Sequence, residues 1–309
     1  DLEDATKVRL DGHLITAIGK ELTPFDGVDT GLFLCSPALL SALEKPTESG
    51  KRSLTRAVRH LIQERKIRAV DVGDRFWMDV DTPESLSDAR RVLLANLAKP
   101  SEDGFVARWL NRRVSLRLSS YLASTRLSPG AITLASFVIA LSGALLFAVG
   151  SYLWTVLAGL LVQVASIVDG CDGEIARLKF QTSRFGAWAD TVLDRYADVA
   201  VVAGISLGHW QTHQTAFTLL GAILALTGFI LASYTKKEYE LRYGSEPPSG
   251  LLARLSKRDM RLFVLFAGAL LNRPFEAMIL AGAVSHLAVG VHFLTASRRD
   301  RRLREPRLP

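Results

Sequence analysis

The sequence predicts a polytopic α-helical membrane protein with six transmembrane helices, preceded by a small N-terminal α+β domain on the cytoplasmic side. Three observations predict this fold: apolar runs of membrane-spanning length after residue 130, basic residues gathered on alternate sides of these runs, and mixed helix and strand patterns before residue 100. Hydrophobic residues make up 49% of the 309 residues. We therefore divide the chain into residues 1–100, 101–127 and 128–309.

The net charge of +7 arises from 38 basic and 31 acidic residues. Because the basic residues cluster beside apolar runs, we attribute them to anionic lipid headgroups and expect no nucleic acid partner. The two cysteines, Cys35 and Cys171, are far apart in sequence and lack neighbouring metal ligands. We expect neither a disulfide nor a zinc site.

The first hundred residues carry short strand and helix patterns. Residues 8–18 predict a hairpin around the turn pair Asp11-Gly12. The other expected elements are strands at 29–36, 69–72 and 76–80, helices at 37–44 and 53–65, and a helix that begins with Pro83.

Residues 105–122 alternate basic with apolar and aromatic residues at helical spacing. Such a helix would lie flat in the membrane interface, with arginines toward headgroups and Trp109 and Leu116 inward. An ordinary soluble amphipathic helix is the alternative. The position of the segment directly before the first apolar run favours the interface.

Six apolar runs follow, at 131–150, 152–168, 187–208, 216–234, 262–271 and 275–296. A bilayer requires about 20 apolar residues, and the fifth run falls short of this. Basic residues precede the first run, separate the second from the third and the fourth from the fifth, and follow the sixth, whereas the alternate loops contain only Arg273. Since positive residues mark the cytoplasmic side, we expect six spans in the cell membrane, with both termini and the site described next on the cytoplasmic side.

Four carboxylates lie at the cytoplasmic ends of the second and third spans: Asp169, Asp172, Asp190 and Asp194. Acids near the hydrocarbon layer are costly and usually functional, and four close together repel unless cations lie between them. On helices, Asp169, Asp172 and Ala176 share one stripe, and Gly186 recurs with the later acids at i, i+4 and i+8. The two stripes predict an oxygen cage for Mg²⁺ or Mn²⁺. Helix caps and surface salt bridges, the alternative, do not explain six positions in register across two spans.

The same stretch resembles the signature of the CDP-alcohol phosphotransferases, D-x2-D-G-x2-A-R-x8-G-x3-D-x3-D. It matches this signature without gap or substitution from Asp169 to Asp194. The resemblance implies an integral-membrane enzyme that transfers a substituted phosphate from a CDP-alcohol donor to an acceptor hydroxyl and releases CMP. It also implies a lipid bilayer and a second copy of the chain, in a homodimer, as partners.

The resemblance assigns roles to the motif. Asp169, Asp172 and Asp190 would hold two Mg²⁺ or Mn²⁺ ions, and Asp194 would be both a metal ligand and the general base. Residues implied to contact the nucleotide are Thr133, Asp169, Asp172, Gly173, Ala176, Arg177 and Gly186. Gly173 and Gly186 leave the backbone open to the nucleotide, and Arg177 offers its guanidinium to a phosphate. Thr133 matches the family's Pro-x-x-x-Thr start of the first span, although Gly130 replaces the usual asparagine.

Polar and basic residues near the last motif aspartate could bind a phosphorylated acceptor, as in family members that use inositol phosphate: Arg195, Tyr234, Lys236, Arg258 and Arg261. For Arg258 and Arg261, positive-inside topology is an equal alternative. We expect Asp198 to pair with Arg195 and not with a metal. The donor stays open between CDP-inositol, CDP-diacylglycerol and CDP-archaeol.

A second resemblance covers the front part. Residues 28–34 and 77–84 resemble the C-terminal half of sugar-phosphate nucleotidyltransferases, with Asp79 and Asp81 near that family's metal positions. The Gly-rich loop that holds the nucleotide in that family is absent from this sequence. We therefore expect a truncated, inactive nucleotidyltransferase-like domain.

A membrane transporter or channel with a carboxylate-lined cation path is the rival from another functional class. Transporter sites lie near the bilayer midplane, often between internal repeats. Here the acids lie at one mouth and no repeat is evident. CMP release from CDP-alcohols separates the two hypotheses.

Overall fold

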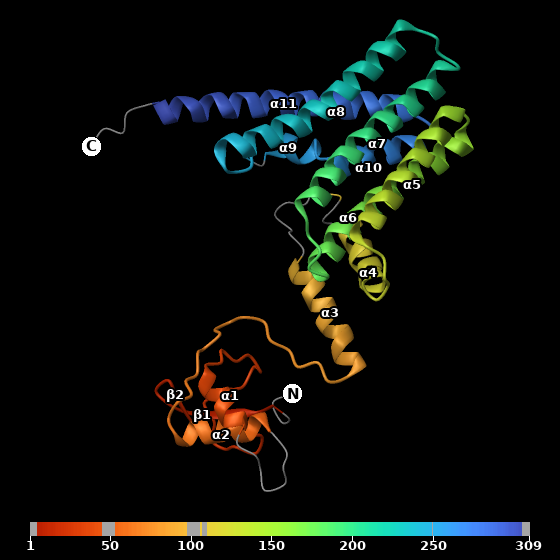
Figure 1. Cartoon of the computed structure of the whole chain (residues 1–309). Coiled ribbons are helices and arrows are strands. Elements are labelled where there is room, and N and C mark those ends of the chain that lie inside the picture. Colours follow the sequence, from red (N-terminus) through yellow and green to blue (C-terminus); the bar gives the residue numbers. More distant parts are fainter. Residues whose placement is uncertain (1–4, 45–52, 98–105, 107–109, 249, 305–309) are drawn as a thin grey trace. The chain divides into compact units, whose positions relative to one another are not determined.

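The computed structural model describes residues 5–44, 53–97, 106, 110–248 and 250–304 (Figure 1). The chain divides into two compact units, Asp1–Val80 and Asp81–Pro309, and each is described by itself.

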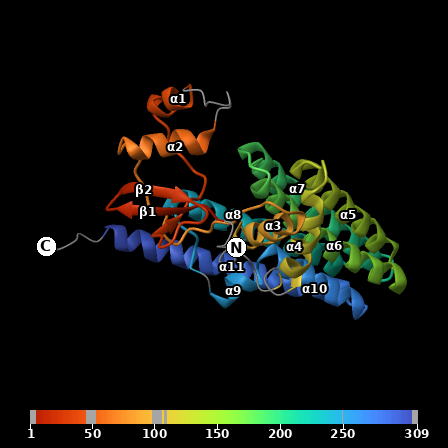
Figure 2. The ribbon, with the colours of Figure 1, turned by 90° about the horizontal axis from the view of Figure 1, so that it is seen from below.

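The first unit contains a small antiparallel sheet with strand order β2-β1-β3. Its elements are β1 (Lys7–Asp11), β2 (Leu14–Gly19), β3 (Gly27–Val28), α1 (Pro37–Glu44) and α2 (Leu54–Gln63). The predicted hairpin is confirmed, with Gly12 in the turn at a φ of +61°. Helix α2 lies beside β2 (Figure 2) and packs its Ala57 and Leu61 against Ala42 of α1.

The strands predicted at 29–36, 69–72 and 76–80 are wrong, because a strand forms only where a neighbouring backbone can pair with it. The chain near Arg68 makes one isolated bridge to Leu14, with flanking hydrogen bonds to Ile15 of β2 and to His13 in the turn before it. Beyond Ala69 the described residues show no further ladder, and Val70 is 85% exposed. Leu32 and Leu34 are likewise exposed, although their apolar character predicted burial.

The second unit is helical. Its helices are α3 (Pro83–Leu97), α4 (Arg112–Ala123), α5 (Pro129–Val149), α6 (Tyr152–Leu178), α7 (Arg184–Trp210), α8 (Ala216–Tyr243), α9 (Leu251–Leu255), α10 (Arg258–Leu270) and α11 (Pro274–Arg304). The predicted start of α3 is confirmed by reciprocal hydrogen bonds between Thr82 and Ser85. Each of the six apolar runs lies within a helix, from α5 to α8 and then in α10 and α11, apart from one or two residues at the ends of some runs.

Close helix crossings hold this unit together. Helix α5 packs against α6 and α7, α8 packs against α7 and α11, and α10 packs against α6 and α11. At the α5–α7 crossing, a Cβ on Gly204 would overlap the backbone of Ala144, and one on Gly208 would overlap the carbonyl oxygen of Phe147. Glycine at these positions lets two backbones approach, as is common where helices associate in membranes.

Helix α4 is attached to α6 by buried polar groups. Arg112 Nη1 donates to Glu174 Oε1 over 2.6 Å, and Ser115 Oγ donates to the same oxygen over 2.8 Å. Asn111 joins this interface through Gln163. The expectation that the arginines of this helix all point to headgroups is therefore wrong for Arg112, because the buried Glu174 carboxylate requires a cation. Trp109 lies outside the described residues, and Leu116 is half-buried.

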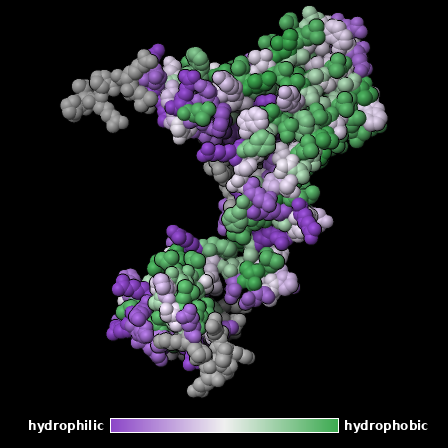
Figure 3. Space-filling view, in the orientation of Figure 1, coloured by the Kyte–Doolittle hydropathy of each residue, from purple (hydrophilic) through white to green (hydrophobic). Residues whose placement is uncertain are grey.

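Within the described part of the chain, four helices are long and apolar enough to cross a membrane: α5, α6, α8 and α11. Hydrophobic side chains cover most of the visible surface of α5 and α7 (Figure 3). Helix α7 is as long as α6, but its last 18 residues include Asp194, Arg195 and Asp198. The chain is thus a multi-pass helical membrane protein with a small N-terminal sheet.

The close crossing at Gly204 gives a stability prediction. We expect Gly204→Ala to lower stability by about 1–3 kcal/mol, because the added methyl forces α5 and α7 apart. Gly290→Ala on α11 is the matched control, since a Cβ there meets no atom within 4 Å. It should be neutral or stabilising by up to about 1 kcal/mol. Thermal unfolding in detergent would measure both, and equal midpoints would contradict the close packing.

Candidate metal and active site

Helices α5 and α6 position the first two motif acids. Asp169 and Asp172 lie on the face of α6 that meets α5. Thr133 Oγ1 donates a short hydrogen bond to Asp172 Oδ2, and Ser136 Oγ lies 3.5 Å from Asp169 Oδ1. Both hydroxyls come from one face of α5, three residues apart, so α5 holds the two carboxylates in place.

The first turns of α7 position the other two acids. Ser183 is the N-cap, and its hydroxyl accepts a hydrogen bond from the Gly186 backbone N–H over 2.9 Å. Because the helix starts there, Gly186, Asp190 and Asp194 recur along one face. The predicted register is confirmed by the unbroken helix from Arg184 to Trp210.

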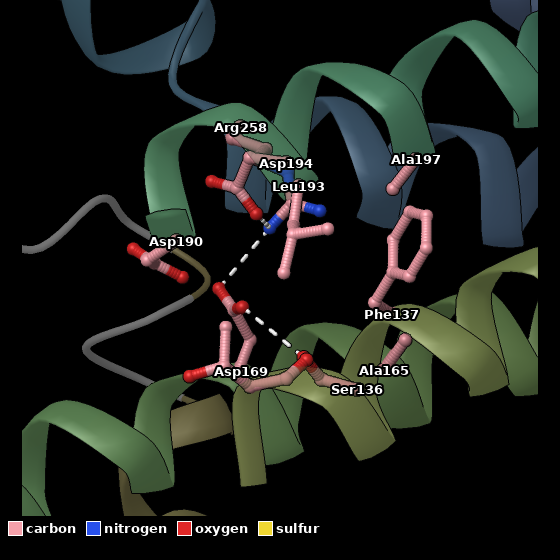
Figure 4. A pocket seen from close by; sticks show the side chains of 10 residues that line it. Ser136, Phe137, Ala165, Asp169, Asp190, Leu193, Asp194, Ala197 and Arg258 are labelled. Atoms are coloured by element: carbon pink, nitrogen blue, oxygen red, sulfur yellow. Dashed lines mark hydrogen bonds and ion pairs between the residues drawn. The ribbon is translucent and has the colours of Figure 1, made fainter. Parts of the chain in front are cut away.

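Three carboxylates converge between α6 and α7. One oxygen each of Asp169, Asp190 and Asp194 lies within 4.8 Å of the others (Figure 4). Asp190 Oδ1 is buried and has no hydrogen-bond partner among the described residues. Hard oxygen donors at this spacing, one of them lacking a partner, fit a divalent cation such as Mg²⁺ or Mn²⁺.

A small cavity lies beside the three clustered acids. The remaining motif residues lie near the cluster but do not line this cavity. Asp172 lies outside the three-acid group and is held by Thr133. The guanidinium of Arg177 lies against Gly173, where a Cβ would be 3.2 Å from Nη1. The carbonyl of Ala176 accepts a hydrogen bond from the Gln181 backbone, at the end of α6.

A half-buried arginine bridges the acids. Arg258, the first residue of α10, places Nη1 2.6 Å from Asp194 Oδ1 and 3.1 Å from Asp169 Oδ2. Its Nε lies 3.4 Å from Asp198 Oδ1. Figure 4 shows the guanidinium reaching into the space between the carboxylates. A fixed positive charge therefore already compensates part of the repulsion within the cluster.

Asp198 anchors three arginines on the inner side of the cluster. Arg195 Nη1 lies 3.2 Å from Asp198 Oδ2 and donates to Ser233 Oγ over 2.6 Å. The expected Asp198–Arg195 pair is confirmed. Arg261, only 2% exposed, contacts the same carboxylate at 3.4 Å and donates to the Phe229 carbonyl. Nothing in the sequence pattern predicts that Arg258 and Arg261 share this carboxylate.

The other two residues considered for acceptor binding lie elsewhere. Tyr234 is 60% exposed on α8. Lys236 pairs with Glu246 at 3.0 Å and with Glu240 at 3.5 Å. The structure brings neither residue to the acid cluster.

Four further residues that line the cavity beside the acids were not predicted: Ser136, and the apolar wall formed by Phe137, Leu193 and Ala197. Ser136 had a recognisable signal, because it lies three residues after Thr133 and so shares its helical face. The apolar residues carry no such signal, since they resemble any other lipid-facing or core position.

The fold and this acid cluster define a helical membrane protein with a candidate divalent-metal site, and comparison with known proteins defines the family. Residues 126–293 match the CDP-alcohol phosphatidyltransferase family model. The chain belongs to that family.

Curated relatives align along most of the chain. A bifunctional IPC transferase and DIPP synthase of Rubrobacter xylanophilus is 39% identical over 97% of this chain and 67% of its own length. The protein of the same description from Aquifex aeolicus is 33% identical over 93% of this chain and 65% of its own length. The chain thus spans about two thirds of the length of these relatives.

Among solved structures, the fold is similar to phosphatidylinositol phosphate synthase of Mycobacterium tuberculosis, determined with CDP-DAG bound. The TM-score is 0.51 at 23% identity, over 59% of this chain and 93% of that one. This likeness supports the fold of the helical unit.

Removal of one cluster carboxylate tests the metal site. We expect Asp190→Asn to weaken Mn²⁺ binding by about 10–100-fold or more, because a charged ligand is lost from the site. Electron paramagnetic resonance titration of free Mn²⁺ in detergent would measure it. Asp88→Asn, at an exposed position of α3, is the control and should leave the affinity unchanged. An unchanged Mn²⁺ affinity in Asp190→Asn would exclude this carboxylate as a ligand.

Proposed function

We propose that this chain transfers a substituted phosphate from a CDP-alcohol to an acceptor hydroxyl and releases CMP. The observation that carries the proposal is the convergence of Asp169, Asp190 and Asp194 from two helices within 4.8 Å. Membership of the CDP-alcohol phosphatidyltransferase family favours this activity over a transporter or channel.

The motif residues divide the work. Asp169, Asp172, Asp190 and Asp194 would hold two divalent ions, Mg²⁺ or Mn²⁺. When bound, such ions supply positive charge for the donor pyrophosphate and the leaving CMP. Gly173 and Gly186 leave room for the nucleotide along α6 and α7, while Ala176 and Thr133 border that space. Arg177, whose buried Nε has no partner among the described atoms, would bind a donor phosphate.

Asp194 would be the general base. Arg258 bonds its Oδ1, so we assign the proton to Oδ2, the oxygen on the side of Arg195. The acceptor hydroxyl would lose its proton to this oxygen as its own oxygen attacks the β-phosphorus of the donor. The new bond joins the acceptor oxygen to that phosphorus, the pyrophosphate bridge breaks, and CMP leaves.

The acceptor would be a phosphorylated polyol such as inositol phosphate. Arg258 and Arg195 border the cluster and present guanidinium groups suited to a phosphate. Arg261 would act through Asp198, because its own side chain is enclosed. Tyr234 and Lys236 would contribute only if the C-terminal part of α8 closes toward the site. The similarity to phosphatidylinositol phosphate synthase and to IPC transferases supports inositol phosphate lipid synthesis as the setting.

We further propose six spans, with both termini and the site on the cytoplasmic side. On α7, the charged Asp194, Arg195 and Asp198 lie toward the bundle, while Trp188, Tyr196 and Leu207 are exposed apolar or aromatic residues. Such a division suits a span whose charges are sheltered by neighbouring helices. Helix α10 has only 13 residues. Counting it as a span keeps the basic C-terminal end of α11 on the same side as the other basic segments. A homodimer in the cell membrane is part of this proposal.

For the front part, residues 1–100, we propose a nucleotidyltransferase-like domain without activity of its own, joined through the 101–127 segment to the helical domain at 128–309. Asp79 and Asp81 are exposed and lie in a stretch without regular structure. No third carboxylate completes a metal cluster with them among the described residues.

CMP release from a panel of CDP-alcohols, with Mg²⁺ and inositol phosphate, tests the function. We expect release by the native chain, and a fall of about 10²–10⁴-fold in Asp194→Asn because the general base is lost. Asp88→Asn should retain the native rate. If the native chain releases no CMP from any donor of the panel, the proposed function is wrong.

A further inference from the structure

The position of Arg258 indicates how the site handles positive charge. Its Nη1 atom contacts two of the three clustered carboxylates, at 2.6 Å and 3.1 Å. Its side chain is only 17% exposed, so water screens these contacts weakly. The guanidinium therefore occupies the electrostatic position that a divalent ion between Asp169 and Asp194 would take.

Two positive charges cannot share this position without cost. An ion that ligates Asp169 and Asp194 lies about 2.0–2.2 Å from their oxygens. The guanidinium nitrogen contacts the same two carboxyl groups, so ion and arginine would be neighbours in a poorly screened space. The ion and the guanidinium must therefore each lower the affinity of these acids for the other.

Asp198 gives Arg258 a further contact that does not involve the three clustered acids. The carboxylate contacts the Nε of Arg258 at 3.4 Å, and it also contacts Arg195 and Arg261. A guanidinium has five N–H donors, so Arg258 can keep its Nε contact while its Nη groups turn to another anion. The anion would be the phosphate group that we propose for the acceptor.

We propose that Arg258 is an internal counter-cation of the acid cluster that competes with the divalent ion, and that a bound phosphate relieves this competition by drawing its guanidinium away. Metal binding and phosphate binding are then positively coupled through one residue. By linkage, the phosphate strengthens metal binding by the same factor as the metal strengthens phosphate binding. This inference rests on the proposed function for the identity of the phosphate ligand.

The chain offers a matched control for the charge effect. Arg261 is buried and also contacts Asp198, but no ion pair links it to Asp169 or Asp194. Arg261→Gln therefore removes the same charge from the neighbourhood without removing a competitor from the cluster. Arg258→Gln removes the charge and also removes the competitor from the cluster.

The test is a titration of Mn²⁺ by electron paramagnetic resonance on the full chain in detergent, with and without inositol 1-phosphate. Uncharged inositol is the ligand control, and free Mn²⁺ is corrected for binding to the phosphate in solution. Without phosphate, Arg258→Gln should bind Mn²⁺ on the order of tenfold more tightly than the native chain, within the usual range of coupling between sites. Arg261→Gln should show a smaller change.

Inositol 1-phosphate should tighten Mn²⁺ binding in the native chain and in Arg261→Gln, but not in Arg258→Gln. If Arg258→Gln binds Mn²⁺ no more tightly than Arg261→Gln, or still responds to the phosphate, the inference is overturned. Should Arg258→Gln fail to fold, Arg258→Met replaces it, because methionine removes the same charge with an unbranched, flexible side chain; the same comparison then decides.

Failure of the inference and failure of the proposed function give different results. If the chain releases CMP but its Mn²⁺ affinity does not depend on Arg258, the proposed function stands and the coupling is rejected. If Mn²⁺ and phosphate binding are coupled but no donor yields CMP, the coupling stands and the proposed function is rejected.

Discussion

Three carboxylates cannot lie within a few ångströms of one another in an apolar bundle unless positive charge lies among them. This constraint organises the centre of the helical unit. Helices α6 and α7 supply the acids, and α10 begins with the arginine that bridges Asp169 and Asp194. Asp198 then balances the surplus of arginines on the inner side. The three clustered acids are thus followed by arginines, and the arginines by the single acid Asp198. This alternation of charges allows a charged site at the end of an otherwise apolar helix bundle.

The surrounding helices fix the geometry of this centre by different means. Helix α5 uses two hydroxyls, on Thr133 and Ser136, which hydrogen-bond to the carboxylates of Asp172 and Asp169 and orient them. Helix α4 is attached to another side of α6 by the ion pair of Arg112 with the buried Glu174, which directly follows Gly173. Farther from the site, glycines such as Gly204 bring α5 and α7 into backbone contact. The result is a site whose ligands sit on packed helices and not on loops, as accurate positioning of a metal requires.

Much of this arrangement follows from the sequence because it depends on local spacing. The i, i+4, i+8 pattern of Gly186, Asp190 and Asp194 determines one face of a helix whatever lies opposite. The same holds for the hairpin at Asp11-Gly12 and for the helix that begins with Pro83. Strands at 29–36, 69–72 and 76–80 were predicted wrongly because a strand depends on a distant partner that composition does not reveal.

Charged residues in the bundle were the other limit of the sequence analysis. Arg258 and Arg261 are three residues apart and looked equivalent as a basic flank of a span. Only their packing separates them, with one against the acid cluster and the other beneath Phe229. Arg112 looked like a headgroup contact because its partner Glu174 is 62 residues away. Pairing across such distances in sequence leaves no periodic trace.

We propose that the acids of α6 and α7 together bind a divalent ion. The most direct measurement is anomalous X-ray scattering from crystals of the chain grown with Mn²⁺. The account predicts an anomalous peak between α6 and α7, within coordination distance (about 2.0–2.2 Å) of carboxylate oxygens of Asp169 and Asp190. Mn²⁺ bound only elsewhere, with the guanidinium of Arg258 still holding Asp169 and Asp194 together at saturating metal, would contradict it.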